Sequence, residues 1–322
     1  WRSGQVPGIR RPGHISDTFI QIAMAFFKRH QGRGSYDLFS TYNYFMPGFS
    51  DLVWLVILFF VGTFLGGLIS AGLALGISQD FALTYGMVII YPVQFIPAML
   101  YASAVSRRNM GFEPGYALDS SNFGGRSGFS MALIVSVMAL AAAFVIEPIS
   151  MLLPDMSEAM KLAMEQLLEG PVWIVLISVS VFAPFFEEWL CRGIILRGLL
   201  KKVKPGWAIA ISALIFGLIH MNLWQAIPAF IIGAILGYVY YKTGSLKLTM
   251  LMHCVNNTLS VIISRIPGLE DVEFFAEIMS PWAYIPMLLA FAVALASGLL
   301  IIRSIPLKEG NLGGCDAVEE FK

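Results

Sequence analysis

The sequence predicts an all-α polytopic membrane protein, a bundle of about eight transmembrane helices with both termini on the cytoplasmic side. Of its 322 residues 57% are apolar and only 13% are charged, and the mean hydropathy of +0.73 exceeds what a soluble domain needs to fill its core. Apolar runs recur along the chain, and ~20 such residues suffice to cross ~30 Å of hydrocarbon as a helix. Lysine and arginine gather in alternate connecting segments, as expected of cytoplasmic loops.

The first part of the chain, residues 1–170, contains two amphipathic segments and three peripheral spans. Residues 17–29 are amphipathic with a cationic end, which predicts a helix lying in the membrane interface. Residues 155–169 begin with Asp155 and Glu158 at the spacing of a capping box, which predicts a second amphipathic helix. The predicted spans of this part are the apolar runs 53–77, 81–104 and 129–150.

Four consecutive apolar runs form the predicted core of the molecule, residues 171–264. The second and third of these runs are the shortest of all the predicted spans. The last part of the chain, residues 265–322, contains one more span at 282–303 and a polar cytoplasmic tail. The four runs of the core are 171–200, 206–221, 225–241 and 246–264.

Charged residues outside the spans predict an even number of crossings. The acidic clusters at 155–169 and 270–277 fall on the side opposite the basic segments, with Lys161 and Arg265 as exceptions. The formal net charge is zero, from 21 basic and 21 acidic residues, so no global field favours nucleic acid as a partner. The basic segments on the predicted cytoplasmic side are 2–33, 107–126, 201–204, 242–247 and 303–308.

Ionisable side chains inside the spans are candidates for a functional site, because each costs roughly 2.5–3.5 kcal/mol at mid-bilayer on insertion scales. Span 171–200 contains four of them, Glu187, Glu188, Arg192 and Arg197. Glu188 and Arg192 are one helical turn apart, so the arginine is predicted to lie against that glutamate. Glu187 is rotated by about 100° and has no such partner on its own helix, which makes it the candidate general base.

Pro184 lies one turn before these glutamates. A proline inside a helix removes a backbone hydrogen bond, so a kink is predicted that frees the carbonyl of Ser180, four residues back. Such a kink opens a wet cavity beside Glu187, or it serves packing alone, and the sequence leaves both interpretations open.

Two further polar groups lie in later spans. His253 and Asn257 are one turn apart, and their N–H groups suit an oxygen that gains negative charge during acyl transfer. Hydrogen bonding between helices is the alternative for this pair. His220 follows Phe216 by one turn, as an interfacial histidine or a catalytic one, whereas Asn256 is predicted to point elsewhere.

These three clusters resemble the motifs of the CAAX prenyl protease and bacteriocin-processing family, which comprises intramembrane glutamate proteases. Its Glu-Glu-x-x-x-Arg motif is matched by EEWLCR at 187–192, Phe-x-x-x-His by FGLIH at 216–220, and His-x-x-x-Asn by HCVNN at 253–257. The three occur in the expected order, each in its own span, and the resemblance covers about residues 171–264.

The resemblance implies an intramembrane endopeptidase with residues 171–264 as a four-helix catalytic core and no metal or other cofactor. It implies that Glu187 and His220 hold and deprotonate a water that attacks a peptide carbonyl. It further implies that the oxyanion is stabilised by His253 and Asn257, and that the site is braced by Glu188 and Arg192.

Other functions use the same residues. A zinc-dependent membrane protease would place the metal on Glu187, His220 and His253, although the chain contains no H-E-x-x-H motif. A proton-coupled transporter would use the ionisable groups as a relay, although no internal repeat is evident. A non-catalytic membrane scaffold is the fourth hypothesis.

The implied partners are membrane lipid and a peptide or protein substrate near the membrane, and the expected location is the prokaryotic plasma membrane. At ~1.5 Å per residue, Glu187 is predicted ~20 Å from Lys201 and His253 ~10 Å from Lys247, so the cavity is predicted to open to the cytoplasm. The loops 30–50 and 106–128 are candidates for substrate gating on that side. The cleavage sequence, the use of prenylated substrates and the oligomeric state are left open.

Overall fold

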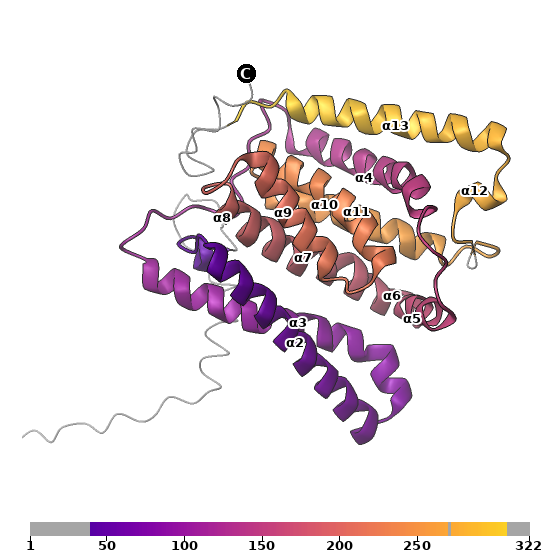
Figure 1. Ribbon diagram of the computed structural model, residues 1–322, viewed down its shortest axis with the longest axis horizontal. Helices are drawn as coiled ribbons and strands as arrows, with labels where there is room; N and C mark the ends of the chain where they lie inside the picture. Colours follow the sequence, from indigo (N-terminus) through magenta and orange to yellow (C-terminus); the bar gives the residue numbers. More distant parts are fainter. Residues whose placement is uncertain (1–38, 270–271, 308–322) are drawn as a thin grey trace, which may run out of the picture.

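A computed structural model describes residues 39–269 and 272–307, and within these ranges the chain is helical with no strand (Figure 1). The predicted all-α fold is therefore confirmed. The interfacial helix predicted at 17–29 lies outside the described residues. Among the described residues seven helices are long and apolar enough to cross a membrane, which makes the protein a multi-pass membrane protein.

Two long helices at one side of the bundle form a hairpin, α2 (Phe49–Gly76) and α3 (Gln79–Asn109), and lie side by side (Figure 1). They approach one another closely at Gly62, where a Cβ atom would stand only 2.0 Å from the carbonyl oxygen of Gln94. The Gln94 amide donates a hydrogen bond of 2.9 Å to the Thr63 hydroxyl at the same crossing. A small residue at position 62 is therefore what lets the two backbones meet.

A second pair of helices covers the other side, α4 (Gly128–Ser150) and α13 (Pro281–Arg303). They contact one another through the buried Met138 on α4 and Gly298 on α13. Both helices lie on the far side of the bundle from the α2–α3 hairpin (Figure 1).

The amphipathic helix predicted at 155–169 is α5 (Glu158–Leu168). Its first turn is capped by Ser157, whose hydroxyl accepts from the N–H of Met160 at 3.3 Å. The prediction of Asp155 as the capping residue is therefore wrong, because the serine that lies two positions later can make this bond.

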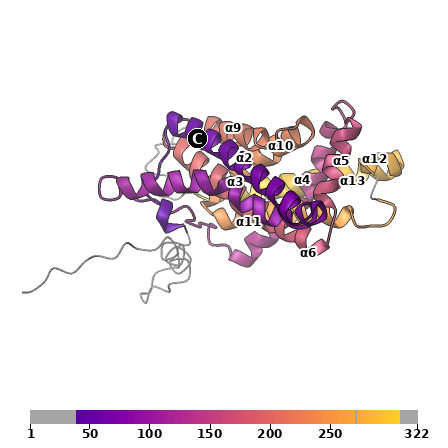
Figure 2. The same ribbon diagram turned by 90° about the horizontal axis from the view of Figure 1, so that it is seen from below.

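The two acidic segments lie toward the same end of the molecule (Figures 1 and 2), where an ion pair joins α5 to the residues just before α12 (Phe275–Ile278). Lys161 forms an ion pair of 2.9 Å with Glu273, and the hydrogen bond to Glu273 raises the pKa of this lysine. Arg265 donates to the carbonyl of Gly170 at 3.0 Å. Lys161 and Arg265, the two basic residues that depart from the charge pattern, therefore both bind neighbouring groups at this end of the molecule.

The central element is one continuous helix, Val172–Leu199, and it is the most buried of the long apolar helices described. It is not a regular α-helix, because two stretches are π-helical. Such stretches are rare in proteins and are frequent at functional sites. In order its segments are α6 (Val172–Val175), η2 (Leu176–Phe182, π), α7 (Ala183–Glu188), η3 (Trp189–Leu196, π) and α8 (Arg197–Leu199).

Pro184 explains where the first π-helical stretch ends. The N–H of Ala183 bonds to the carbonyl of Ser178, five residues back. In that register the next donor would be the N–H of residue 184 toward the carbonyl of Val179, and proline has no N–H. The carbonyl left without a backbone donor is therefore that of Val179, whereas the α-helical spacing assumed from the sequence pointed to Ser180.

Three helices complete the core, α9 (Pro205–Leu218), α10 (Leu223–Thr243) and α11 (Leu246–Ile263). The run predicted as a span at 206–221 is α9, which has only 14 residues. At ~1.5 Å per residue it is about 21 Å long, short of a ~30 Å hydrocarbon layer. It is therefore a short apolar helix rather than an eighth full span.

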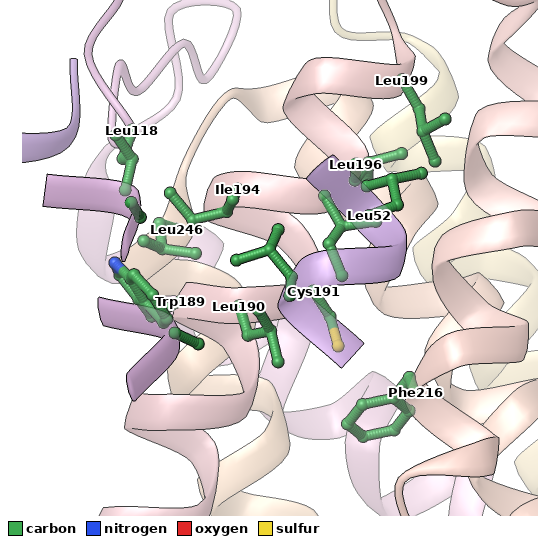
Figure 3. Close-up of a cluster of buried hydrophobic side chains, with 14 of the residues drawn as sticks. Leu52, Leu118, Trp189, Leu190, Cys191, Ile194, Leu196, Leu199, Phe216 and Leu246 are labelled. Carbon is green, nitrogen blue, oxygen red and sulfur yellow. The ribbon is translucent and has the colours of Figure 1, made fainter. Parts of the chain in front are cut away.

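Arg197 joins the central helix to two connecting segments. Its side chain is only 1% exposed and donates to the carbonyls of Tyr42, at 3.0 Å, and Phe45, at 2.8 Å. It also donates to the carbonyl of Tyr116. Leu118, two residues after Tyr116, packs with Leu246 against the central helix (Figure 3). The described parts of the two predicted gating loops are therefore fixed to the core.

Candidate active site

A buried ion pair forms the base of the site. Arg192 Nη1 lies 2.6 Å from Glu188 Oε1, and both side chains are fully shielded from solvent, so the pairing predicted from their spacing is confirmed. Arg192 Nη2 donates to the carbonyl of Gly233 at 2.9 Å, and the guanidinium stands 4.3 Å from the centre of the Phe216 ring. The arginine thus ties the central helix to α9 and α10.

Gly233 permits this contact. A Cβ atom at this position would lie 3.2 Å from Arg192 Nη2, 3.0 Å from the Phe216 ring and 3.3 Å from the backbone of Ala213. A larger residue would push α10 away from the central helix and break the bond to the guanidinium. The glycine is therefore required for the close approach of the three helices.

His253 is oriented by the same glutamate. Its Nδ1 lies 3.0 Å from Glu188 Oε1, and since a carboxylate paired with arginine can only accept, Nδ1 carries the proton. The other ring nitrogen, Nε2, then faces Glu187, with 3.8 Å between it and Oε2. His253 is 4% exposed, so Glu188 fixes the direction of a buried imidazole.

Glu187 has two oxygens in different surroundings. Oε1 accepts a hydrogen bond from the hydroxyl of Tyr91 on α3. Among the described residues Oε2 has no hydrogen-bond partner, since 3.8 Å to His253 Nε2 is too long for a hydrogen bond. The side chain is only 6% exposed. One oxygen of this carboxylate is therefore anchored, and the other is available beside an imidazole.

His220 lies at the end of α9 and is half-buried. Its Nδ1 is 2.8 Å from the carbonyl of Phe216, which can only accept, so Nδ1–H donates and Nε2 carries the lone pair in the neutral ring. The Phe216 ring meets both imidazoles edge to face, with centroids 5.3 Å from His220 and 5.4 Å from His253. The two histidines thus flank one aromatic ring.

The turn after His220 is strained. Met221 has φ of 57°, a left-handed conformation that costs a residue with a side chain on the order of 1–3 kcal/mol. Asn222 holds this turn by donating to the carbonyl of His220 at 2.9 Å and by accepting from the N–H of Gln225 at 2.8 Å. Strain held in this way keeps the end of α9, and with it His220, in one position.

Asn257 is half-buried on α11, one turn after His253. Its amide donates to the carbonyl of Val179 at 2.8 Å, the same carbonyl that Pro184 leaves without a backbone donor. The neighbouring Asn256 donates to Asn257 Oδ1 at 3.2 Å. The bond between helices that the sequence offered as an alternative is therefore present, and one amide hydrogen of Asn257 remains.

The structure brings together two of the three predicted zinc ligands, Glu187 and His253. Among the residues that the structure describes, no three His, Cys, Asp or Glu side chains are placed to hold a metal ion. Glu187 Oε2 and His253 Nε2 are 3.8 Å apart, and His253 Nδ1 contacts Glu188.

Sequence reasoning missed two groups at the site. Tyr91 lies in an apolar span far from the motifs, and a hydroxyl inside a span was the only signal for it. The carbonyl of Val179 left no signal, because its availability depends on the π-helical register.

Comparison with known proteins identifies the central segment. Residues 169–259 match the model of a family described as type II CAAX prenyl endopeptidase Rce1-like. This segment includes all six predicted site residues, so the resemblance indicated by the three motifs is confirmed over the part of the chain that carries them. Tyr91 lies outside it.

One curated protein is similar to the chain, the Bacillus subtilis (strain 168) protein named "Putative membrane peptidase YdiL". The two are 29% identical over 104 residues, which cover 32% of this chain and 41% of the relative. The matched part therefore spans about two fifths of that protein. No solved structure matches the chain.

Proposed function

We propose, from the family match over residues 169–259, that this protein is an intramembrane endopeptidase that hydrolyses a peptide bond with a water activated by Glu187. The observation that carries the proposal is the free Oε2 of Glu187, 3.8 Å from His253 Nε2 in a buried site. The proposed substrate is a peptide or protein segment near the membrane. The proposed location is the prokaryotic plasma membrane, in line with the bacterial relative.

The first step is proton transfer from the water to Glu187 Oε2 as its oxygen attacks the peptide carbonyl. The resulting tetrahedral intermediate carries one negative oxygen. Collapse of the intermediate breaks the carbon–nitrogen bond, and the proton held by Glu187 passes to the leaving amine. The products are a carboxylic acid and an amine, and transfer of a proton between them gives a carboxylate and an ammonium group. His220 is the proposed second contact of the water, because its bond to the Phe216 carbonyl leaves Nε2 as an acceptor.

His253 is the proposed donor to the negative oxygen, through a proton on Nε2. Glu188 supports this role, because its contact with Nδ1 holds the ring with Nε2 toward Glu187. Asn257 would add its remaining amide hydrogen. Its bond to Val179 keeps it next to the helix that carries Glu187.

Replacing Glu187 tests the proposal. Purified protein in liposomes is expected to cleave a membrane-anchored peptide, and Glu187→Gln is expected to lower kcat by at least ~100-fold, because an amide cannot accept the proton. The matched control is Glu147→Gln on α4, a glutamate that accepts from the N–H of Ala276 at 3.1 Å and lies outside the site. Equal cleavage by native protein and Glu187→Gln would contradict the proposal.

The same assay tests the absence of a metal. Cleavage is expected to continue in excess chelator, with no stoichiometric zinc in active protein. Loss of cleavage on chelation and recovery with zinc would favour the metalloprotease hypothesis. Proton flux without cleavage, lost in Glu187→Gln, would favour the transporter hypothesis.

A further inference from the structure

The hydroxyl of Tyr91 reaches the site from outside the segment shared with the family. It is on α3, in the hairpin at one side of the bundle, and donates a hydrogen bond to Glu187 Oε1. Tyr91 is the one described residue that donates to this carboxylate. The hairpin therefore contributes a polar group to a site otherwise built from the central helix, α9 and α11.

Aromatic contacts hold Tyr91 in place. Its ring stacks on Phe95, one turn later on α3, with centroids 5.8 Å apart. Phe95 is 1% exposed and stacks in turn on Phe186, with centroids 5.3 Å apart and planes 18° from parallel. Phe186 precedes Glu187 in the chain. Tyr91 is thus held through Phe95 by Phe186, the residue next to Glu187.

The two oxygens of a carboxylate are chemically equivalent, and the torsion that exchanges them is broad. A hydrogen bond from a hydroxyl to a charged oxygen is among the stronger ones and lifts this equivalence. With Oε1 held by Tyr91, Oε2 is the oxygen that faces His253 Nε2. Tyr91 on α3 therefore sets the direction in which the lone pairs of Glu187 Oε2 point.

We infer that Tyr91 is a positioning residue that anchors Oε1 of Glu187 and so makes Oε2 the oxygen that takes the proton of the attacking water. The role of Oε2 as proton acceptor rests on the proposed function. The anchoring of Oε1 by Tyr91 does not, because the contact between the phenol and the carboxylate exists in the protein without substrate.

The α3 helix offers a matched control. Tyr101 also donates its hydroxyl to a carboxylate, Asp51 Oδ1 on α2, at 2.6 Å. Tyr91→Phe and Tyr101→Phe therefore remove the same kind of bond from the same helix, and only the first touches Glu187. A difference between the two variants reports on the site and not on the loss of a hydroxyl from α3.

Kinetics of the two variants give the first measurement. Tyr91→Phe is expected to lower kcat by at least ~10-fold with KM unchanged within ~2-fold, because a misplaced base affects the chemical step and not substrate binding. Tyr101→Phe is expected to keep the native kcat. Unchanged kcat in Tyr91→Phe, an equal loss in both variants, or an effect on KM alone would overturn the inference.

Infrared spectroscopy gives a second measurement that does not depend on turnover. The carboxyl band of Glu187 is assigned from the difference between native protein and Glu187→Gln, and it is expected to shift in Tyr91→Phe but not in Tyr101→Phe. A band that stays in place in Tyr91→Phe overturns the inference even if the enzyme is active. A purified native protein that cleaves no peptide contradicts the proposed function. In that case the shift of the carboxyl band still tests whether Tyr91 contacts Glu187.

Discussion

At the scale of single residues, Glu188 joins the buried arginine of the site to one of its histidines. One oxygen of Glu188 accepts from Arg192 at 2.6 Å and from His253 at 3.0 Å. Burial of such an ion pair has a desolvation penalty that offsets its attraction, so its net contribution to stability is small, whereas removal of one partner leaves an uncompensated charge. The pair is best explained by the orientation that it gives to His253.

Arg192→Met is accordingly expected to destabilise the protein by about 3–5 kcal/mol, because the charge of Glu188 would stay buried without its cation. The double variant Glu188→Gln with Arg192→Met is expected to recover most of this loss, since neither charge remains. Thermal unfolding in detergent measures both. A single variant as stable as native protein, or a double variant less stable than the single one, would contradict this explanation.

The motifs predicted contacts along one helix better than contacts between helices. The pairing of Glu188 with Arg192 followed from a separation of one turn. The bond from Tyr91 to Glu187 joins residues that are 96 positions apart, and nothing in either local sequence indicates the other. Spacing rules describe neighbours on a single helix, whereas the register between two helices depends on packing.

At the scale of elements, the π-helical stretch before Glu187 sets the rotation of the central helix at this glutamate. Each π-helical turn contains an extra residue, so it changes the direction in which all later side chains point. The stretch ends at Pro184, which cannot supply the N–H that Val179 would need, and the amide of Asn257 supplies it from α11. The direction of Glu187 thus depends on a proline and on a contact between helices.

Pro184→Ala is expected to lower kcat by ~100-fold while the protein stays folded, because alanine allows α-helical bonding and a rotation of Glu187. Circular dichroism and thermal unfolding check the fold, and peptide cleavage checks activity. The matched control is Pro286→Ala, a proline in the first part of α13 outside the site. Full activity in Pro184→Ala would show that the direction of Glu187 does not need the π-helical register.

Hydropathy predicted where the long helices lie but not their local register. The apolar runs and the structure agree on seven long helices among the described residues, and α9 differs because its apolar run continues into a turn at Met221 and Asn222. The π-helical bonds of the central helix have no pattern in the sequence that hydropathy can detect. The first stretch ends at Pro184, which has no backbone N–H to continue it.

At the scale of the whole molecule, the α2–α3 hairpin is the part that brings Tyr91 to the site. The hairpin holds its shape through the crossing at Gly62, and α3 then contacts the central helix through Phe95 and Phe186. A change in the spacing of α2 and α3 would therefore move Tyr91 relative to Glu187.

Gly62→Ala is expected to destabilise the protein by about 1–3 kcal/mol, because the new methyl group would overlap the backbone of α3, which cannot move as a side chain can. Gly67→Ala, on the same helix with no atom within 4 Å of the new Cβ, is the control and is expected to keep or raise stability. Thermal unfolding in detergent compares the two. Equal effects would contradict a close crossing at Gly62.

The packing of the bundle could not be predicted from composition. Helix faces toward lipid are as apolar as faces toward protein, as shown by the exposed Leu68 on α2 and the buried Leu55 on the same helix. The informative positions are small residues such as Gly62 and Gly233, whose partners become evident only in three dimensions.

The shortness of α9 has a consequence for the surrounding lipid. A helix of about 21 Å beside longer neighbours cannot match the full ~30 Å hydrocarbon layer, and lipid responds to such hydrophobic mismatch by thinning. Thinning at the Leu218 end of α9 would bring the lipid surface close to the imidazole of His220. Solvent needed for hydrolysis would therefore have a shorter path through the bilayer there than beside any of the long helices.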